Sequence, residues 1–219
     1  MLSVAIDGPA GVGKSTVSKL LAKKLNWNCL GTGALYRAIA VACKNNNVDI
    51  TEINQVKDLL NKIKIDVKFI DGVQHTYLNN KDVSNELRTE EIDMMSSISS
   101  AYPEVRQSIL HLQRDLANQQ NLVVEGRDIT SNVLKESKNK FYLDASPEER
   151  AKRRYNERNS KGEIANYNEI YQDLLKRDKN DMTRKVAPLV CTKDSIKIDT
   201  TFLSIDEVVE KIYKNIKLS

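Results

Sequence analysis

"IDGPAGVGKST", residues 6–16, is the stretch that decides the fold of this 219-residue chain. It has the spacing G-x-x-x-x-G-K-S, in which glycines allow a tight turn and backbone N–H groups point inward at an anion. The apolar run "LSVAID" (2–7) precedes it, and "KSTVSKLLAKKL" (14–25) follows with apolar residues at helical spacing. A buried strand, a glycine-rich loop and an amphipathic helix in this order predict a phosphate-binding P-loop.

The chemistry of a P-loop assigns roles to its residues. The Lys14 ammonium supplies a charge for the outer phosphates, and the Ser15 hydroxyl is the expected Mg²⁺ ligand. Asp7 and Glu125 are both candidates for a carboxylate that supports the metal. The candidate ATP-binding residues of the loop are Gly8, Pro9, Ala10, Gly11, Val12, Gly13, Lys14, Ser15 and Thr16. The motif predicts nucleotide binding and leaves the acceptor and the reaction open.

Strands and helices alternate along the rest of the chain. Apolar runs of strand length recur at 121–126, 140–145 and 195–201, and helical spacing recurs at 34–45, 53–63, 147–160, 167–183 and 204–216. Helical character also extends from 89 to about 120, with a break at Pro103. This alternation predicts an α/β fold of the P-loop type, a three-layer sandwich with a central parallel sheet.

Two segments do not fit the parallel core. "IDVKFI" (65–70), "DG" and "HTYLN" (75–79) combine alternating polarity with a turn signal, which predicts a β-hairpin. The two highly charged helices at 147–160 and 167–183 follow a buried strand. We interpret both segments as small insertions into the core.

Composition excludes several classes of protein. A net charge of +4 and an aromatic content of 5% offer no broad basic groove or stacking platform for nucleic acid. Three widely spaced cysteines and two histidines favour neither a metal site nor a disulfide framework. Neither a secretion signal nor an apolar run of membrane-spanning length is present, so we expect a cytoplasmic protein.

Arginines near strand ends are candidates for binding an acceptor. Arg37 lies early in the helix that follows "GTG" (31–33), where Thr32 is the expected N-cap. Arg127 and Asp128 follow the buried strand of "VVEGRDI" (123–129). Because ligands of open α/β sheets lie beyond the carboxyl ends of the strands, these side chains are placed to contact a ligand.

The charged helices carry further arginines. Arg150, Arg154 and Arg158 share one helical face, as do Arg177, Asp181 and Arg184 on the next helix. Two basic helices that face each other would repel unless an anion lay between them. We therefore interpret 147–185 as a lid that closes over a triphosphate.

In order and separation, these motifs resemble those of the bacterial cytidylate kinases, within the nucleoside monophosphate (NMP) kinases. The matching segments, spread over essentially the whole chain, are "IDGPAGVGKST", "TGALYR", "YPEVRQSIL", "EGRDI", "PEERAKRRYNER", "KRDKNDMTRKVAPL" and "IDTT". The resemblance implies transfer of the ATP γ-phosphoryl group to CMP or dCMP with Mg²⁺. It also implies a core (about 1–62, 92–146 and 186–219), an NMP-binding insert (about 63–91) and a lid (about 147–185). We expect a monomer.

The resemblance further implies roles for individual residues. Arg37 and Arg127 would hold the CMP phosphate, and Arg177 and Asp181 the sugar hydroxyls. The implied substrate-binding set is Thr32, Arg37, Ser97, Arg106, Arg127, Asp128, Arg177, Asp181 and Arg184, in which Ser97 is chosen by register within "SSISS" (96–100). The implied lid set around the triphosphate is Arg150, Arg153, Arg154 and Arg158. The implied catalytic set is Lys14, Arg127, Arg154 and Arg158.

The implied base-reading pair, Arg106 and Asp128, matches the chemistry of cytosine. A carboxylate accepts from the N4 amino group, and a guanidinium donates to the acceptor edge. Uracil would present O4 to the carboxylate, and such mismatches are rejected by up to roughly 10⁴-fold. No catalytic base is expected, because the acceptor is a phosphate monoester with a second pKa of about 6 and is already an anion at neutral pH.

Four positions in three segments depart from the pattern of this family. Gly31 stands where an aspartate is common, Glu125 replaces a frequent aspartate, and "GRDITS" (126–131) replaces "GRDIGT". The first leaves one carboxylate missing near the phosphates. The last alters the loop after Asp128 at Thr130 and Ser131.

Two other classes of P-loop protein would carry different motifs. A kinase with a hydroxyl acceptor would need a positioned carboxylate base and fewer arginines on the acceptor side. A GTPase-like switch would carry a guanine-reading N-K-x-D at a strand end, whereas "NNKD" (79–82) lies in the predicted hairpin. The arginines favour an anionic acceptor.

Overall fold

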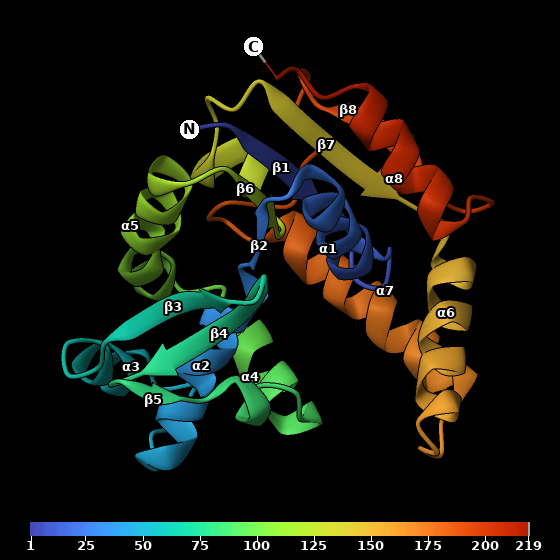
Figure 1. Ribbon diagram of the computed structural model, residues 1–219. Coiled ribbons are helices and arrows are strands. Elements are labelled where there is room, and N and C mark those ends of the chain that lie inside the picture. The colour runs from blue at the N-terminus through green and yellow to red at the C-terminus, as the bar shows by residue number, and fades with distance from the viewer. Residues whose placement is uncertain (219) are drawn as a thin grey trace.

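A five-stranded parallel sheet forms the centre of the computed structural model, which describes residues 1–218 (Figure 1). Its strands are β1 (Ser3–Asp7), β2 (Asn28–Gly31), β6 (Leu122–Glu125), β7 (Asn139–Asp144) and β8 (Ile196–Asp199), in the spatial order β2-β6-β1-β7-β8. Every neighbouring pair is parallel. The central strands β1 and β6 are almost wholly buried and apolar, as expected for a parallel sheet covered on both faces.

Helices cover both faces of this sheet. Alternate residues of β1 separate the two cores: Ile6 packs in a cluster with α1 (Lys14–Leu25) and α8 (Ile205–Lys214), whereas Ala5 packs in a cluster with α2 (Gly33–Asn45) and α5 (Pro103–Gln119). The predicted three-layer α/β architecture is confirmed. Among residues 1–218, no helix combines the length and the apolar character needed to cross a bilayer.

The predicted hairpin is present within a three-stranded antiparallel sheet. It consists of β3 (Ile65–Ile70) and β4 (Val73–Leu78), and its turn residues Asp71 and Gly72 have φ of 51° and 74°, as a two-residue hairpin turn of the primed type requires. The short strand β5 (Lys81–Asp82) and the turn of 3₁₀ helix η1 (Ser84–Glu86) were not predicted. This sheet lies beside α2, α3 (Ile53–Leu60) and α4 (Glu90–Ser99) (Figure 1).

Local capping explains where the remaining helices begin. The predicted helical stretch from 89 divides at Pro103: Thr89 caps α4 by accepting from the Ile92 N–H, and Pro103 is the first residue of α5. The charged helices α6 (Pro147–Ser160) and α7 (Tyr167–Thr183) have the predicted bounds. A single π turn, η2 (Ile129–Val133), follows β6 and was not predicted.

Candidate active site

The carboxyl ends of the central strands open into a cavity of about 1320 Å³. Because pockets for one small ligand usually have about 300–1,000 Å³, this volume suits two nucleotides. Residues from the P-loop, α2, α4, the loop after β6, the lid helices and the loop after β8 line it. The sequence-predicted residues that line it are Ala10, Gly11, Val12, Gly13, Lys14, Ser15, Thr16, Thr32, Arg37, Ser97, Arg106, Glu125, Arg127, Asp128, Arg153, Arg154, Arg158, Arg177, Asp181 and Arg184.

The P-loop backbone has the conformation that its glycines predict. Gly8 has φ of 153°, and a Cβ there would lie 2.2 Å from the Leu143 carbonyl oxygen of β7. Gly13 has φ of 94° at the N-cap of α1, and no side chain of the described residues caps this helix. The first N–H groups of α1 are therefore left to bind an anion.

The Lys14 side chain lies within the loop. Its Nζ donates to the carbonyl oxygens of Gly8 (2.8 Å) and Pro9 (2.7 Å). Burial, reinforced by the positive charge of Arg127, lowers the pKa of Lys14 to about 7. A phosphate in the loop would supply the countercharge that this buried ammonium needs.

The two candidate carboxylates for metal support have different environments. The Asp7 oxygens accept from the Ile129 N–H (2.9 Å), the Thr130 N–H (2.7 Å) and the Thr130 hydroxyl (2.7 Å). Burial raises the pKa of Asp7 to about 6, and the bonds from Thr130 offset part of this effect. Asp7 thus anchors the loop after Asp128, and Thr130, one of the departures, is part of that anchor.

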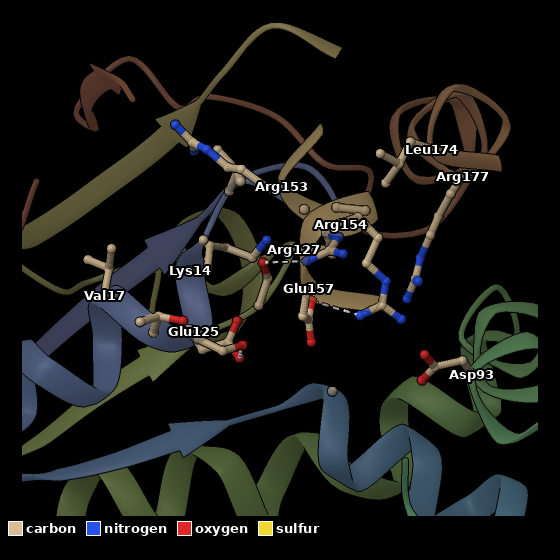
Figure 2. A pocket seen from close by; sticks show the side chains of 18 of the residues that line it. Lys14, Val17, Asp93, Glu125, Arg127, Arg153, Arg154, Glu157, Leu174 and Arg177 are labelled. Atoms are coloured by element: carbon tan, nitrogen blue, oxygen red, sulfur yellow. Dashed lines mark hydrogen bonds and ion pairs between the residues drawn. The ribbon is translucent and has the colours of Figure 1, made fainter. Parts of the chain in front are cut away.

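Glu125 is the carboxylate next to the P-loop hydroxyl. Its Oε1 accepts from the Ser15 Oγ at 2.8 Å, and Figure 2 shows it close to Lys14. No cluster of three or more His, Cys, Asp or Glu side chains with metal-site geometry occurs in residues 1–218. The adjacent Ser15 hydroxyl and Glu125 carboxylate are oxygen donors of the kind through which Mg²⁺ binds together with phosphates and water.

The Glu125 side chain occupies the space next to Gly31. A Cβ at Gly31 would lie 3.2 Å from Oε1 of Glu125, closer than ordinary van der Waals contact. The nearby Thr32 is the N-cap of α2 as predicted, but its hydroxyl donates to the Glu125 carbonyl oxygen (3.0 Å) instead of capping the helix. Gly31 and Glu125, which both depart from the family pattern, are therefore neighbours in space.

Two arginines of the predicted acceptor site are held by carboxylates. Arg37 Nε donates to Asp93 Oδ1 at 2.5 Å, and Arg127 Nε donates to Asp181 Oδ2 at 2.9 Å. Although burial alone would raise the pKa of Asp181, Arg127 holds it below its usual range. Asp93 was not predicted, because nothing in its local sequence marks it as facing Arg37. In Figure 2 it points into the cavity opposite Arg177 of α7.

The predicted base-reading pair is the most buried charge pair in this cavity. Arg106 Nη2 lies 2.5 Å from Asp128 Oδ1, both side chains are 5% exposed, and Arg184 Nη2 lies 3.8 Å from the same oxygen. The Arg106 guanidinium lies over the Tyr36 ring, 5.3 Å from its centroid. Arg106 Nε and Arg184 Nη2 are buried donors without a hydrogen-bond partner within the described chain. Such donors are expected where a polar ligand completes the site.

The hydroxyls of the "SSISS" run distinguish between its serines. Ser96 Oγ donates to the Asp93 carbonyl oxygen (3.0 Å), Ser99 Oγ to that of Ser96 (3.4 Å) and Ser100 Oγ to that of Ser97 (3.0 Å). Ser96, Ser97 and Ser100 all line the cavity, and among these three the Ser97 hydroxyl makes no such bond to the described residues. These contacts favour the Ser97 register.

Carboxylates accompany the lid arginines that line the cavity. Arg153 Nε donates to Glu149 (3.1 Å), Arg154 Nη1 donates to Glu157 (3.0 Å; Figure 2), and Arg158 pairs with Glu90 at the start of α4. Alternating charges on the lid helices relieve the repulsion that the arginine pattern suggested. A triphosphate is therefore not required to bring α6 and α7 together.

Arg150 was expected to lie around the triphosphate with the other lid arginines, and the structure places it outside the cavity. It is 4% exposed and absent from the residues that line the cavity. Its donors are taken by the carbonyl oxygens of Ala145 (3.1 Å) and Ala10 (3.0 Å) and by Asp178 Oδ2 (2.6 Å). Arg150 sits in the first turn of α6, where the helix packs against the P-loop, and these contacts hold its Nε and Nη1 within the protein.

Comparison with known proteins identifies close relatives over the whole chain. The family model described as "Cytidylate kinase" matches residues 4–218. A protein named cytidylate kinase from Caldicellulosiruptor bescii is 42% identical over 220 residues, covering 99% of this chain and 97% of the relative. The Bacillus subtilis (strain 168) protein of that name is 41% identical over 216 residues, covering 99% and 96%.

Comparison with solved structures adds information on the fold only, because the sequence identity is low. An uncharacterized protein from Eubacterium ventriosum has a TM-score of 0.53 to this chain at 15% identity, and the match covers 100% of both chains.

Proposed function

This chain belongs to the cytidylate kinase family. We propose that its P-loop holds the triphosphate of ATP and that arginines of α2 and of the loop after β6 hold the phosphate of CMP or dCMP. The reaction moves the γ-phosphoryl group of ATP to the phosphate of CMP or dCMP and yields ADP with CDP or dCDP. The observation that carries the site assignment is the buried Arg106–Asp128 pair, because both residues line the same cavity as the P-loop.

We assign the acceptor phosphate to Arg37 and Arg127. Both are paired with carboxylates in this structure, so an incoming phosphate would exchange with Asp93 and Asp181 as their anionic partner. The guanidinium fork suits a phosphate because it can donate two parallel hydrogen bonds. Asp181, released from Arg127 but still beside Arg184 (3.5 Å), and Arg177 would then contact the sugar hydroxyls.

We assign the cytosine to Asp128, Arg106 and Ser97, with Arg184 beside them. The Asp128 carboxylate would accept from the N4 amino group, and Arg106 would donate to the acceptor edge of the base. Uracil would leave the carboxylate facing an oxygen, at the cost of a buried charge without a donor.

Catalysis in this proposal is electrostatic. The acceptor phosphate is already an anion, so the protein must position it and neutralise the charge that develops on the moving group. Lys14, Arg127, Arg154 and Arg158 are the candidates for this role. Ser15 and Glu125 would hold Mg²⁺, which would neutralise phosphate charge when bound.

These assignments divide the chain into a core, an NMP-binding insert and a lid. The insert at about 63–91 and the lid at about 147–185 would close on the core at about 1–62, 92–146 and 186–219. Closure would exclude water from the phosphates. We further propose a monomer that acts in the cytoplasm.

A coupled assay of ADP formation across CMP, dCMP, UMP, AMP and GMP, with ATP and Mg²⁺, tests the function. We expect CMP and dCMP to be used much faster than the other three. Equal rates on AMP or GMP, or ADP formation that does not depend on a monophosphate, would reject the proposal. A Lys14→Met variant, expected to lose most of the activity, controls for a contaminating kinase.

A further inference from the structure

The tip of the P-loop is held by the lid and not only by the core. The Ala10 N–H donates to Asp178 Oδ1 of α7 at 3.2 Å, and the Ala10 carbonyl oxygen accepts from Arg150 Nη1 of α6 at 3.0 Å. The same Arg150 nitrogen donates to Asp178 Oδ2 at 2.6 Å. One buried ion pair between the two lid helices therefore binds both backbone groups of a single P-loop residue.

Packing supports this attachment. The Ala10 methyl belongs to a small apolar cluster with Ala151 of α6 and with Ile170 and Leu174 of α7. A Cβ on Gly11 would lie 3.3 Å from Arg150 Cβ, so the loop passes directly over the start of α6. The root of the lid and the tip of the phosphate loop thus form one packed unit.

We propose that the Arg150–Asp178 pair is a positioning device that sets the P-loop conformation from within the lid. Neither side chain is among the residues that line the cavity, so we assign the pair a role through the P-loop backbone and not through contact with the nucleotide. The pair fixes the peptide groups on both sides of Ala10, and thereby the direction of the N–H groups that follow. The inference rests on the proposed assignment of the P-loop to ATP, and it predicts a selective effect on the ATP side of the reaction.

The pair is expected to stay intact as the lid moves. Arg150 is 4% exposed and Asp178 6% exposed, and breaking such a pair would leave a buried charge without a partner. Lid movement would then occur beyond this root, and the P-loop tip would follow any shift of the root itself. This contact therefore couples the conformation of the P-loop to the position of the lid root.

Kinetics of Asp178→Asn test the proposal. Asparagine keeps an oxygen for the Ala10 N–H but removes the charge that orients Arg150. We expect KM for ATP to rise by about tenfold, equivalent to about 1.4 kcal/mol, while KM for CMP stays within about twofold. Arg150→Lys, which keeps the charge and loses the fork, should show the same selectivity and stands in if Asp178→Asn does not fold.

Asp194→Asn is the matched control. Asp194 pairs with the buried Lys140 at 2.7 Å, away from the residues that line the cavity. Its loss should lower the melting temperature and leave both KM values unchanged. If Asp178→Asn also loses only thermal stability, or if its KM values for ATP and CMP rise together, the pair is ordinary structural support and the proposal is wrong.

Hydrogen exchange of the wild-type enzyme provides a readout that needs no variant. With neither nucleotide present, the Ala10 amide should be protected to the same degree as the amides of α7 around Asp178. An unprotected Ala10 amide would overturn the proposal. Turnover of CMP by the wild-type enzyme, measured in parallel, tests the proposed function separately. If CMP is not turned over, the proposed function is wrong, and the exchange of the Ala10 amide still decides whether the Arg150–Asp178 pair holds the P-loop.

Discussion

Substitution of Arg37 by alanine tests the assignment of the acceptor phosphate. In the structure, Arg37 of α2 donates to Asp93 of α4 at 2.5 Å, and the two side chains are 28% and 29% exposed. We expect the CMP phosphate to displace Asp93 when it binds this guanidinium. The expected cost of the substitution is the value of the new contact minus the value of the contact that is broken.

Both values can be bounded. A hydrogen bond to a charged group contributes about 1.5–3 kcal/mol. A partly exposed ion pair contributes about 0.2–1 kcal/mol. The difference, about 0.5–3 kcal/mol, corresponds to a fall of about 2- to 100-fold in kcat/KM for CMP. ATP binding in the absence of CMP should change little, because Lys14 and the lid arginines remain in place.

Steady-state kinetics with CMP varied, together with calorimetry of ATP binding, measure these two effects. Lys44→Ala is the matched control, since Lys44 pairs with Glu91 between the same two helices without lining the cavity. Asp93→Asn should act in the opposite direction and lower KM for CMP by up to about fivefold, because it removes the competing anion. A large loss of ATP affinity in Arg37→Ala, or an unchanged kcat/KM for CMP, would show that Arg37 is misassigned.

Three further predictions address the base, the P-loop neighbour and pH. Asp128→Asn should lower the CMP-over-UMP ratio of kcat/KM by at least about tenfold and cost about 3–5 kcal/mol in urea unfolding, because it leaves Arg106 buried without its countercharge; an unchanged ratio would contradict the base assignment. Gly31→Asp should crowd Glu125 and lower kcat, and adding Glu125→Asp should restore part of that loss. If kcat of the double variant is no higher than the value expected from multiplying the two single effects, the two residues are not in contact. Since the pKa of Lys14 is lowered to about 7 and a bound triphosphate would raise it, ATP binding at pH 8 should take up about one proton, and ATP affinity should fall as the pH rises through 7. Calorimetry in buffers of different ionisation enthalpy measures the uptake, and its absence would refute the role given to Lys14.

Features of short range were predictable from the sequence. Residues 8–16 follow a strand and open a helix, and the local chemistry of glycine, lysine and serine is sufficient to predict both the loop and its charge preference. The hairpin turn at Asp71 and Gly72 and the break at Pro103 are of the same kind. Each depends on a conformational property of one or two residues.

Features that depend on which elements meet were not predictable in the same way. Helical periodicity places Arg150, Arg154 and Arg158 on one face of a helix, but it could not indicate that the first turn of α6 packs against the P-loop and buries Arg150. The carboxylate of Asp93 lies 56 residues from its arginine along the chain, so the pair is invisible before the fold is known. The contact between Gly31 and Glu125 is likewise a product of the pairing of β2 with β6.

A crystal structure of this protein with CMP bound would test the central claim most directly. The account predicts that the CMP phosphate lies within hydrogen-bonding distance of Arg37 and Arg127, that the Arg37–Asp93 pair is broken, and that the cytosine amino group faces Asp128. A CMP phosphate in the loop around Lys14, or a base that leaves the Arg106–Asp128 pair without a ligand contact, would contradict it.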